Sequence, residues 1–241
     1  MKTKLLLLPY LSFFLLFISC EEEITEVQIK DPQAELENLK DSISFQLDGG
    51  TYIFDSPWRN GSGNAQVNLN SITDKGHPDS VLYWREFTLG NAEYKNVTIR
   101  FVKKYGKNQL LNNGLLSRPA NALELYTKGV RPYAVDFQRF NTTDGITIDV
   151  NSIIHNSEII NLQTYLPESR RWLTSIGYDC QNNSSFEVTN LHKLPNGGYM
   201  LEAKFAANLF YFEHKITTDN KVMMEAKQMS IGNGYIRLRV K

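Results

Sequence analysis

Short stretches in which apolar and polar residues alternate recur along the chain and predict β-strands. Ile43, Phe45 and Leu47 alternate with polar residues up to Asp48-Gly49-Gly50, a turn signal that favours a hairpin with the returning segment 51–54. A similar pattern predicts strands at 67–72, 81–89, 94–105, 135–140, 146–150, 186–191, 199–205, 222–229 and 235–240. Many short strands separated by turns are typical of a mainly β, antiparallel domain, either a sandwich or barrel-like.

Turn signals and one short helix separate these strands. Gly232-Asn233-Gly234 predicts a turn before the last strand, and a helix is expected over 119–128, because Pro119 suits its start and Gly129 its end. Residues 151–178 fit either strand or helix, so they predict only mixed structure. We expect the folded domain to cover 42–241, as one domain or as two smaller lobes.

The first residues follow a different pattern, that of a secretory signal. Lys2 and Lys4 precede an apolar run over 5–19, which ends in the small residue Ser19 followed by Cys20. The run is shorter than the ~20 apolar residues of a membrane-spanning helix. It resembles a bacterial lipobox, which implies that Cys20 is acylated, with palmitate among its lipids, and becomes the new N-terminus. The alternatives are an ordinary cleaved signal and an uncleaved anchor.

The residues after Cys20 point to a location. Glu21, Glu22 and Glu23 resemble the acidic tags that carry Bacteroidota lipoproteins to the outer face of the outer membrane. The polar stretch up to Asp41 has few apolar residues and predicts a flexible tether. We therefore expect a signal peptide at 1–19, an acylated cysteine with a tether at 20–41, and a lipid-anchored domain exposed at the cell surface.

Motifs near both ends of the domain resemble a family of uncharacterised Bacteroidota surface lipoproteins. They are Phe45-Gln46-Leu47-Asp48-Gly49, 184–189 (SSFEVT), Ala203-Lys204-Phe205 and 231–238 (IGNGYIRL). The resemblance implies a β-rich fold in which an Asn-Gly turn leads into the last strand. It brings no catalytic residue and no cofactor.

The charge balance restricts the partners. Without residues 1–19 the chain has 24 of its 26 basic residues and all 26 acidic ones, a net charge of −2. A balance of this kind argues against nucleic acid and against a membrane surface bound by charge, since both favour clustered Lys and Arg. We therefore expect membrane contact through the lipid alone.

Metal and thiol chemistry have little support. The four histidines, His77, His155, His192 and His214, form no zinc-binding pair, and Cys180 is left as a lone, inert thiol. Asp74, Asp79, Asp144 and Asp149 lie in or beside predicted loops, where solvated turn carboxylates are favoured over a calcium site. We expect no metal and no cofactor.

Aromatic residues supply the only binding candidates. Trp58 in a polar, Gly-rich loop, Trp172 after two arginines, and Tyr83 beside Trp84 could present rings to a sugar, whereas core packing is favoured for Trp84. The chain has no nucleophile elbow and no phosphate-binding loop. The expected function is a noncatalytic module that binds a glycan or a surface protein, or assembles in the envelope. The alternative is an extracellular glycoside or peptide hydrolase with a carboxylate pair that leaves no sequence signature.

Overall fold

Antiparallel strands make up most of the computed structural model, which describes residues 36, 38–57, 66–73, 79–113, 116–137, 144–166, 175–216, 218 and 222–241. Two short 3₁₀ helices, η1 (Lys107–Gln109) and η2 (Ala122–Tyr126), interrupt the strands. The strands are β1 (Ser42–Leu47), β2 (Gly50–Phe54), β3 (Ser56–Pro57), β4 (Gln66–Thr73), β5 (Ser80–Gly90), β6 (Asn96–Gly106), β7 (Leu110–Asn113), β8 (Leu116–Pro119), β9 (Gly129–Val130), β10 (Gly145–His155), β11 (Glu158–Gln163), β12 (Ser185–Lys193), β13 (Tyr199–Ile216) and β14 (Val222–Val240).

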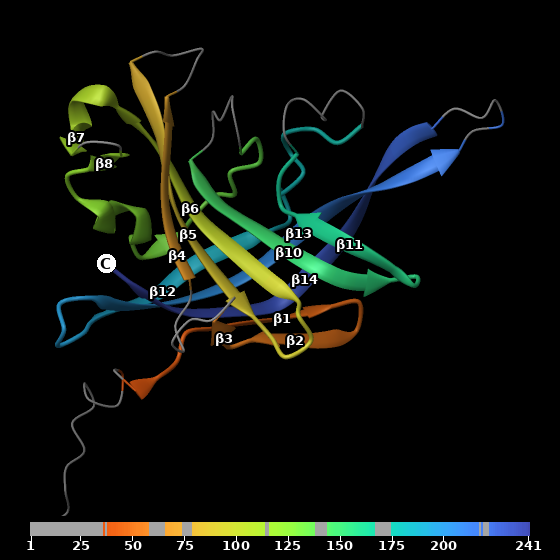
Figure 1. The fold of residues 1–241 in the computed structure, drawn as a ribbon, viewed down its shortest axis with the longest axis horizontal. Helices are drawn as coiled ribbons and strands as arrows, with labels where there is room; N and C mark the ends of the chain where they lie inside the picture. The colour runs from red at the N-terminus through yellow and green to blue at the C-terminus, as the bar shows by residue number, and fades with distance from the viewer. Residues whose placement is uncertain are drawn as a thin grey trace, which may run out of the picture. The chain divides into compact units, whose positions relative to one another are not determined.

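One twelve-stranded sheet folds over itself. Its strands follow the order β2-β1-β14-β13-β11-β10-β6-β5-β3, with β12 also paired to β13, β9 to β12 and β4 to β5, while β7 and β8 form a separate pair. In Figure 1, β5, β6 and β10 cross over β12, β13 and β14. Phe101 of β6 meets Phe186 of β12 between them, with ring centroids 6.0 Å apart. The prediction of a mainly β, antiparallel, sandwich-like domain is confirmed.

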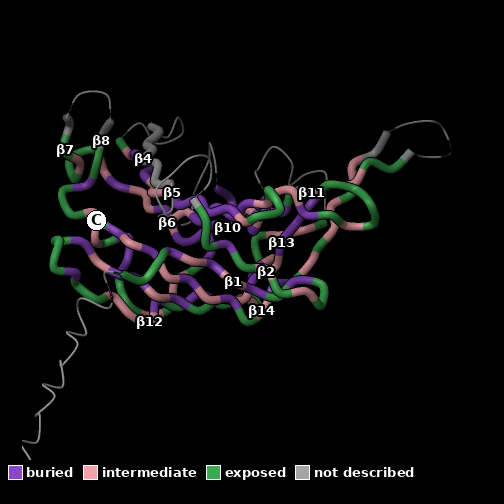
Figure 2. The backbone as a smooth tube through the Cα atoms, turned by 60° about the horizontal axis from the view of Figure 1, so that its bottom comes forward, coloured by how far each residue is buried: buried purple, intermediate pink, exposed green. Residues whose placement is uncertain are grey.

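The alternating pattern places the core between the two halves of the sheet. Val97, Ile99 and Phe101 on β6 are fully buried, and they share one cluster with Phe45 of β1 and Leu201 of β13. Buried residues follow the middles of the strands, and the hairpin ends are exposed (Figure 2). Apolar burial at every second position is therefore what holds the two halves together.

Two hairpin turns have successive residues with positive φ angles. At the predicted first turn, Asp48 and Gly49 have φ of 50° and 74°. Between β10 and β11, where the sequence predicted only mixed structure, Asn156 and Ser157 have φ of 48° and 67°. Two successive positive φ angles are those of a type I′ turn, whose twist matches that of paired strands.

The prediction of a turn at Gly232-Asn233-Gly234 is wrong. β14 runs without a break from Val222 to Val240, and these residues form a bulge opposite β13, where Phe205 pairs with Gly234 and Ala207 with Ile231. Asn233 has the left-handed φ of 50° that such a bulge uses. Glycine and asparagine therefore relieve the local backbone here without reversing the chain.

The strand expected at 135–140 is also absent from the described part of that segment. Val135 and Asp136 form a turn, and residues 138–140 lie outside the described residues. Phe137 packs edge-on against Trp84 and Tyr165, with centroids 5.3 and 5.2 Å away. Ala134 and Phe137 cover the outer face of β5 and β6, whereas Val135 packs in the main core, so the burial of these residues does not come from strand pairing. The packing reading of Trp84 is confirmed.

The predicted helix at 119–128 is a single 3₁₀ segment, η2. Asn121 caps it by accepting a hydrogen bond from the Leu123 amide at 3.1 Å, whereas Pro119 ends β8 and Gly129 begins β9. The ring of Tyr126 lies 5.0 Å from that of Phe101, so packing on the core fixes this short segment.

The predicted signal peptide, Cys20 and most of the tether lie outside the described residues. The end of the tether is attached to the domain, because Asp41 is 1% exposed and its carboxylate accepts a hydrogen bond from the Arg239 amide at 2.9 Å. The carbonyl of Lys40 accepts a bond from Arg237 Nε at 2.9 Å. The last residues before β1 are thus bound to the domain.

Candidate functional site

The pairing between β11 and β13 stops almost as soon as it starts. Gln163 pairs with Phe210, and beyond that pair the two strands diverge, with β13 and β14 continuing as a hairpin arm past β11 (Figure 1). A groove of about 940 Å³ opens between them, near the upper end of the range for ligand sites. We call it the split-sheet groove, lined by Asn156, Glu158, Ile159, Ile160, Asn161, Gln163, Phe210, Tyr211, Phe212, Glu213, His214 and Met224.

The outer side of the split-sheet groove is largely apolar. Side chains alternate along a strand, so Phe210, Phe212 and His214 lie on the face of β13 opposite to the core residues Leu209 and Tyr211. Met224 of β14 pairs with His214, which extends this surface.

The tip of the β10–β11 hairpin continues the apolar surface. Ile159 of β11 is 74% exposed and pairs across the hairpin with Ile154, which is 66% exposed. These two large apolar side chains, directly opposite each other and open to solvent, form an exposed apolar patch at the hairpin tip.

The inner side of the groove is acidic. Tyr211 is 6% exposed and donates a hydrogen bond from its hydroxyl to Glu213 Oε1 at 3.0 Å. Burial raises the pKa of Tyr211, and the negative charges of Glu213 and Glu158 raise it further. Lys227 lies 4.0 Å from Glu213, but it also pairs with Glu225 at 3.0 Å. Among the described lining residues none is Lys or Arg, so this side favours a cationic ligand.

His155 and Asp48 lie beside the groove rather than in it. The His155 ring meets that of Tyr211 edge-on at 5.8 Å, and its Nδ1 is 3.8 Å from Asp48 Oδ2, too far for a hydrogen bond. His155 therefore packs against the end of the core, and the pair lacks the contact that an oriented catalytic base requires.

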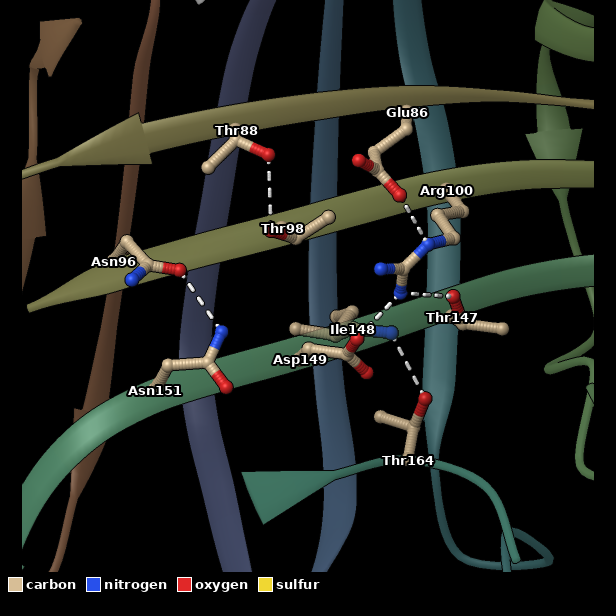
Figure 3. Close-up of polar contacts among 10 residues, drawn as sticks. All are labelled: Glu86, Thr88, Asn96, Thr98, Arg100, Thr147, Ile148, Asp149, Asn151 and Thr164. Carbon is tan, nitrogen blue, oxygen red and sulfur yellow. Dashed lines mark hydrogen bonds and ion pairs between the residues drawn. The ribbon is translucent and has the colours of Figure 1, made fainter. Parts of the chain in front are cut away.

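A second polar cluster lies on the outer face of β5, β6 and β10, and it is largely enclosed. Arg100 Nε bonds to Glu86 at 2.6 Å, and its Nη1 bonds to Asp149 at 2.5 Å and to Thr147 at 3.5 Å (Figure 3). Its guanidinium also lies 5.4 Å from the centre of the Phe137 ring. Neighbouring polar groups bond across the strands as Thr88 with Thr98, Asn96 with Asn151, and Thr164 with the Ile148 amide.

This Arg100 cluster has the properties of a structural network. Both carboxylates bind the same guanidinium, and the side chains of Arg100, Glu86 and Asp149 are 14%, 19% and 15% exposed. Burial raises the pKa of Asp149, and the positive charge of Arg100 opposes that shift. With both acids engaged by one cation, the pair is not arranged as a separate acid and base around a substrate.

Of the sequence-predicted site residues, only Tyr83 is among the described residues. Cys20, Trp58 and Trp172 lie outside the described residues. Tyr83 is 2% exposed and packs edge-on against Tyr105, with centroids 6.2 Å apart, so its ring does not face solvent. The expectation that Tyr83 presents its ring to a sugar is therefore incompatible with its position in the core.

The described structure also places several of the aspartates and histidines that the sequence singled out. Asp149 lies within β10 and binds Arg100, so it is not a solvated turn carboxylate. Asp144 directly precedes β10 and accepts a bond from the Lys104 amide at 2.6 Å. His192 and His214 are exposed, and no group of three His, Cys, Asp or Glu in the described chain could hold a metal ion.

Cys180 lies in the turn that precedes β12. It is half-buried and packs against the main core, and its carbonyl accepts a hydrogen bond from Asn208 Nδ2 at 2.9 Å. In the same turn, Gln181 Nε2 bonds to the carbonyls of Thr164 and Asn208 at 2.8 and 2.7 Å. This turn thereby joins the end of β11 to β13 next to the Gln163–Phe210 pair.

Sequence reasoning missed the residues of the split-sheet groove. A signal was present in the segment 153–160, where isoleucine pairs flank the polar residues His155 to Glu158. Such symmetry fits a hairpin that is apolar on both faces. Because the core covers only one face, the second apolar face indicates a binding surface.

Comparison of the chain with protein-family models, with characterised proteins and with solved structures gives no match. In the described part of the chain, no helix has both the length and the apolar character needed to cross a bilayer.

Proposed function

We propose that this chain is an exported, lipid-anchored protein of the outer membrane that binds a partner at the cell surface without catalysing a reaction. The location rests on the sequence around Cys20. The binding role rests on one structural observation, the divergence of β11 and β13 after the Gln163–Phe210 pair. Strand edges that diverge around a groove favour recognition or assembly through the sheet.

The site has the mixture of surfaces that binding requires. Ile159 and Met224 provide apolar area, and Glu158 and Glu213 provide charge that selects among partners. Apolar contacts supply most of the binding energy in such a site, while charged groups determine which partners are accepted. A surface protein with a complementary segment is the partner class that these side chains favour over a glycan.

Photo-crosslinking tests this proposal. A photo-reactive amino acid at Ile159 in intact producing cells is expected to give a discrete adduct, identified by mass spectrometry as an envelope or surface component. The matched control is Val130, which is also on a strand and is 79% exposed but is not a groove residue. Equal adducts at both positions, or none at Ile159, would contradict the binding role.

A hydrolase is the second candidate, because Glu158 and Glu213 both line the groove. If they act as a catalytic pair, the purified chain releases reducing ends or new amino termini from envelope polysaccharide or peptide. Glu213→Gln would then abolish that release. The hydrogen bond from Tyr211 to Glu213 and the nearby Lys227 favour the binding role instead, since they hold this carboxylate in place as a charged group.

A further inference from the structure

The split-sheet groove has two chemically different sides. Successive side chains of β11 and β13 point to one side and then to the other. Ile159 and Asn161 of β11 lie on the outer side with Phe212, whereas Ile160 packs towards the core. On the inner side the neighbours are Tyr211 and the two carboxylates, and the same face of β13 continues to Lys215 beyond the last lining residue of the groove. An extended chain between the strands would point successive side chains to these two sides in turn.

The dimensions of the groove suit a short strand. β13 continues from Tyr211 to Ile216 beyond its pair with β11, a length of about 20 Å at ~3.4 Å per residue. A segment of about six residues would span that distance. Its main chain could continue the ladder that ends at Gln163 and Phe210, as in β-strand addition.

We propose that the groove receives an extended segment of another protein, about six residues long, in which apolar residues alternate with Lys or Arg. The inference rests on the proposed binding function and names its partner class. Apolar side chains would meet Ile159, Phe212 and Met224, and the basic ones would meet Glu158 and Glu213.

Charge favours a segment of another protein over this chain's own segment after Cys20 as the occupant of the groove. The segment after Cys20 contains Glu21, Glu22, Glu23 and Glu26 and would bring negative charge to an acidic wall. Like charges placed together cost binding energy, whereas opposite charges steer and orient the partner. A basic segment from a different protein therefore complements the groove, and this chain's acidic segment does not.

A labelled peptide tests the proposal directly. Fluorescence anisotropy would follow acetyl-Val-Lys-Val-Lys-Val-Lys-amide binding to the full chain purified in detergent. We expect saturable binding that is at least tenfold tighter than that of the Val-Glu counterpart and of the block peptide Val-Val-Val-Lys-Lys-Lys. N-methylation of alternate peptide amides, which removes main-chain donors, is expected to weaken binding by a similar factor.

Variants locate the binding. Replacing both Glu158 and Glu213 by Gln is expected to weaken the affinity for the Val-Lys peptide by roughly tenfold, because two partly exposed charge pairs are lost. Glu93→Gln, a matched change at an exposed carboxylate on the β5–β6 turn, is expected to leave binding unchanged. Circular dichroism of each variant would establish that the fold is retained.

The two experiments distinguish a wrong partner class from a wrong binding role. If the alternating basic peptide binds no better than the controls while Ile159 still crosslinks to a discrete partner, the partner class is wrong and the binding role stands. A crosslink between two copies of this chain would overturn the partner class in the same way. If neither peptide binding nor crosslinking occurs, both proposals fall.

Discussion

Gly234 of β14 lies directly opposite Phe205 of β13, and the Phe205 ring fills the space that a side chain on Gly234 would need. A Cβ atom there would come within 2.5 Å of the ring. Gly232, two residues away in the same bulge, has no heavy atom within 4 Å of its corresponding position. The bulge thus contains one glycine that packing requires and one that it does not.

This difference predicts unequal effects of the same substitution. Gly234→Ala is expected to lower the free energy of unfolding by about 1–3 kcal/mol, because the buried Phe205 ring must move. Gly232→Ala is expected to change it by less than about 0.5 kcal/mol. Urea denaturation of both variants would measure the difference, and equal losses would contradict the packing account.

Arg100 is expected to be the most sensitive position of the polar cluster. Arg100→Met leaves Glu86 and Asp149 close together without their shared cation, and should cost about 3–5 kcal/mol of unfolding free energy. Lys103→Met is the control, since the pair of Lys103 with Glu124 is exposed and should cost less than about 1 kcal/mol. A smaller loss at Arg100 than at Lys103 would refute a structural role for the cluster.

Asp149 should make stability depend on pH. Burial raises its pKa above the ordinary value of 3.8, so the folded protein binds this proton more tightly than the unfolded chain does. The contribution is complete below about pH 3.8 and is lost as the pH rises through the raised pKa. Relative to Asp149→Asn, the wild-type unfolding free energy should therefore fall over that window. A flat difference in thermal melts would rule this out.

Glu202 is expected to have the opposite dependence. The hydrogen bond from the Tyr235 hydroxyl lowers the pKa of Glu202 below its ordinary value of 4.5. Its contribution is present above that value and is lost as the pH falls through the lowered pKa. Wild type compared with Glu202→Gln should lose its advantage on acidification, and the same melts would reveal an opposite slope.

Cys20 determines the proposed location. Cys20→Ala is expected to shift the protein from the membrane fraction to the soluble exported fraction, because multiple acyl chains anchor a protein stably. Mass spectrometry of the wild type should give a mature chain that begins with acylated Cys20, and protease treatment of intact cells would test surface exposure. Persistent membrane association of the variant would contradict lipid anchoring.

Local patterns predicted most of the strands but not the ends of several. The first hairpin follows from Asp48-Gly49 and the alternation around it, both of which act over a few residues. Val135 and Phe137 alternate as strand residues do, yet they form no strand: Val135 packs in the main core, and Phe137 covers the outer face of the sheet between Trp84 and Tyr165. Burial by distant residues overrides a local preference in such a segment.

The candidate site was less accessible to sequence reasoning. Ile159 and Glu213 are 54 positions apart in the numbering, and nothing in either segment specifies that they share a groove. The aromatic residues that suggested a binding surface include Tyr83, which the packing of β5 turns into the core. Composition identifies ring-bearing residues, but only the fold decides which rings face solvent.

The sequence by itself determined the β class, the first hairpin turn at Asp48-Gly49 and the pattern around Cys20 that predicts export, because each depends on neighbouring residues. The tertiary structure alone decided that Gly232-Asn233-Gly234 bulges instead of turning, and that β11 pairs with β13 only through Gln163 and Phe210. Two strands stay paired only while twist and packing keep their edges within hydrogen-bonding distance, and that depends on how the rest of the sheet packs.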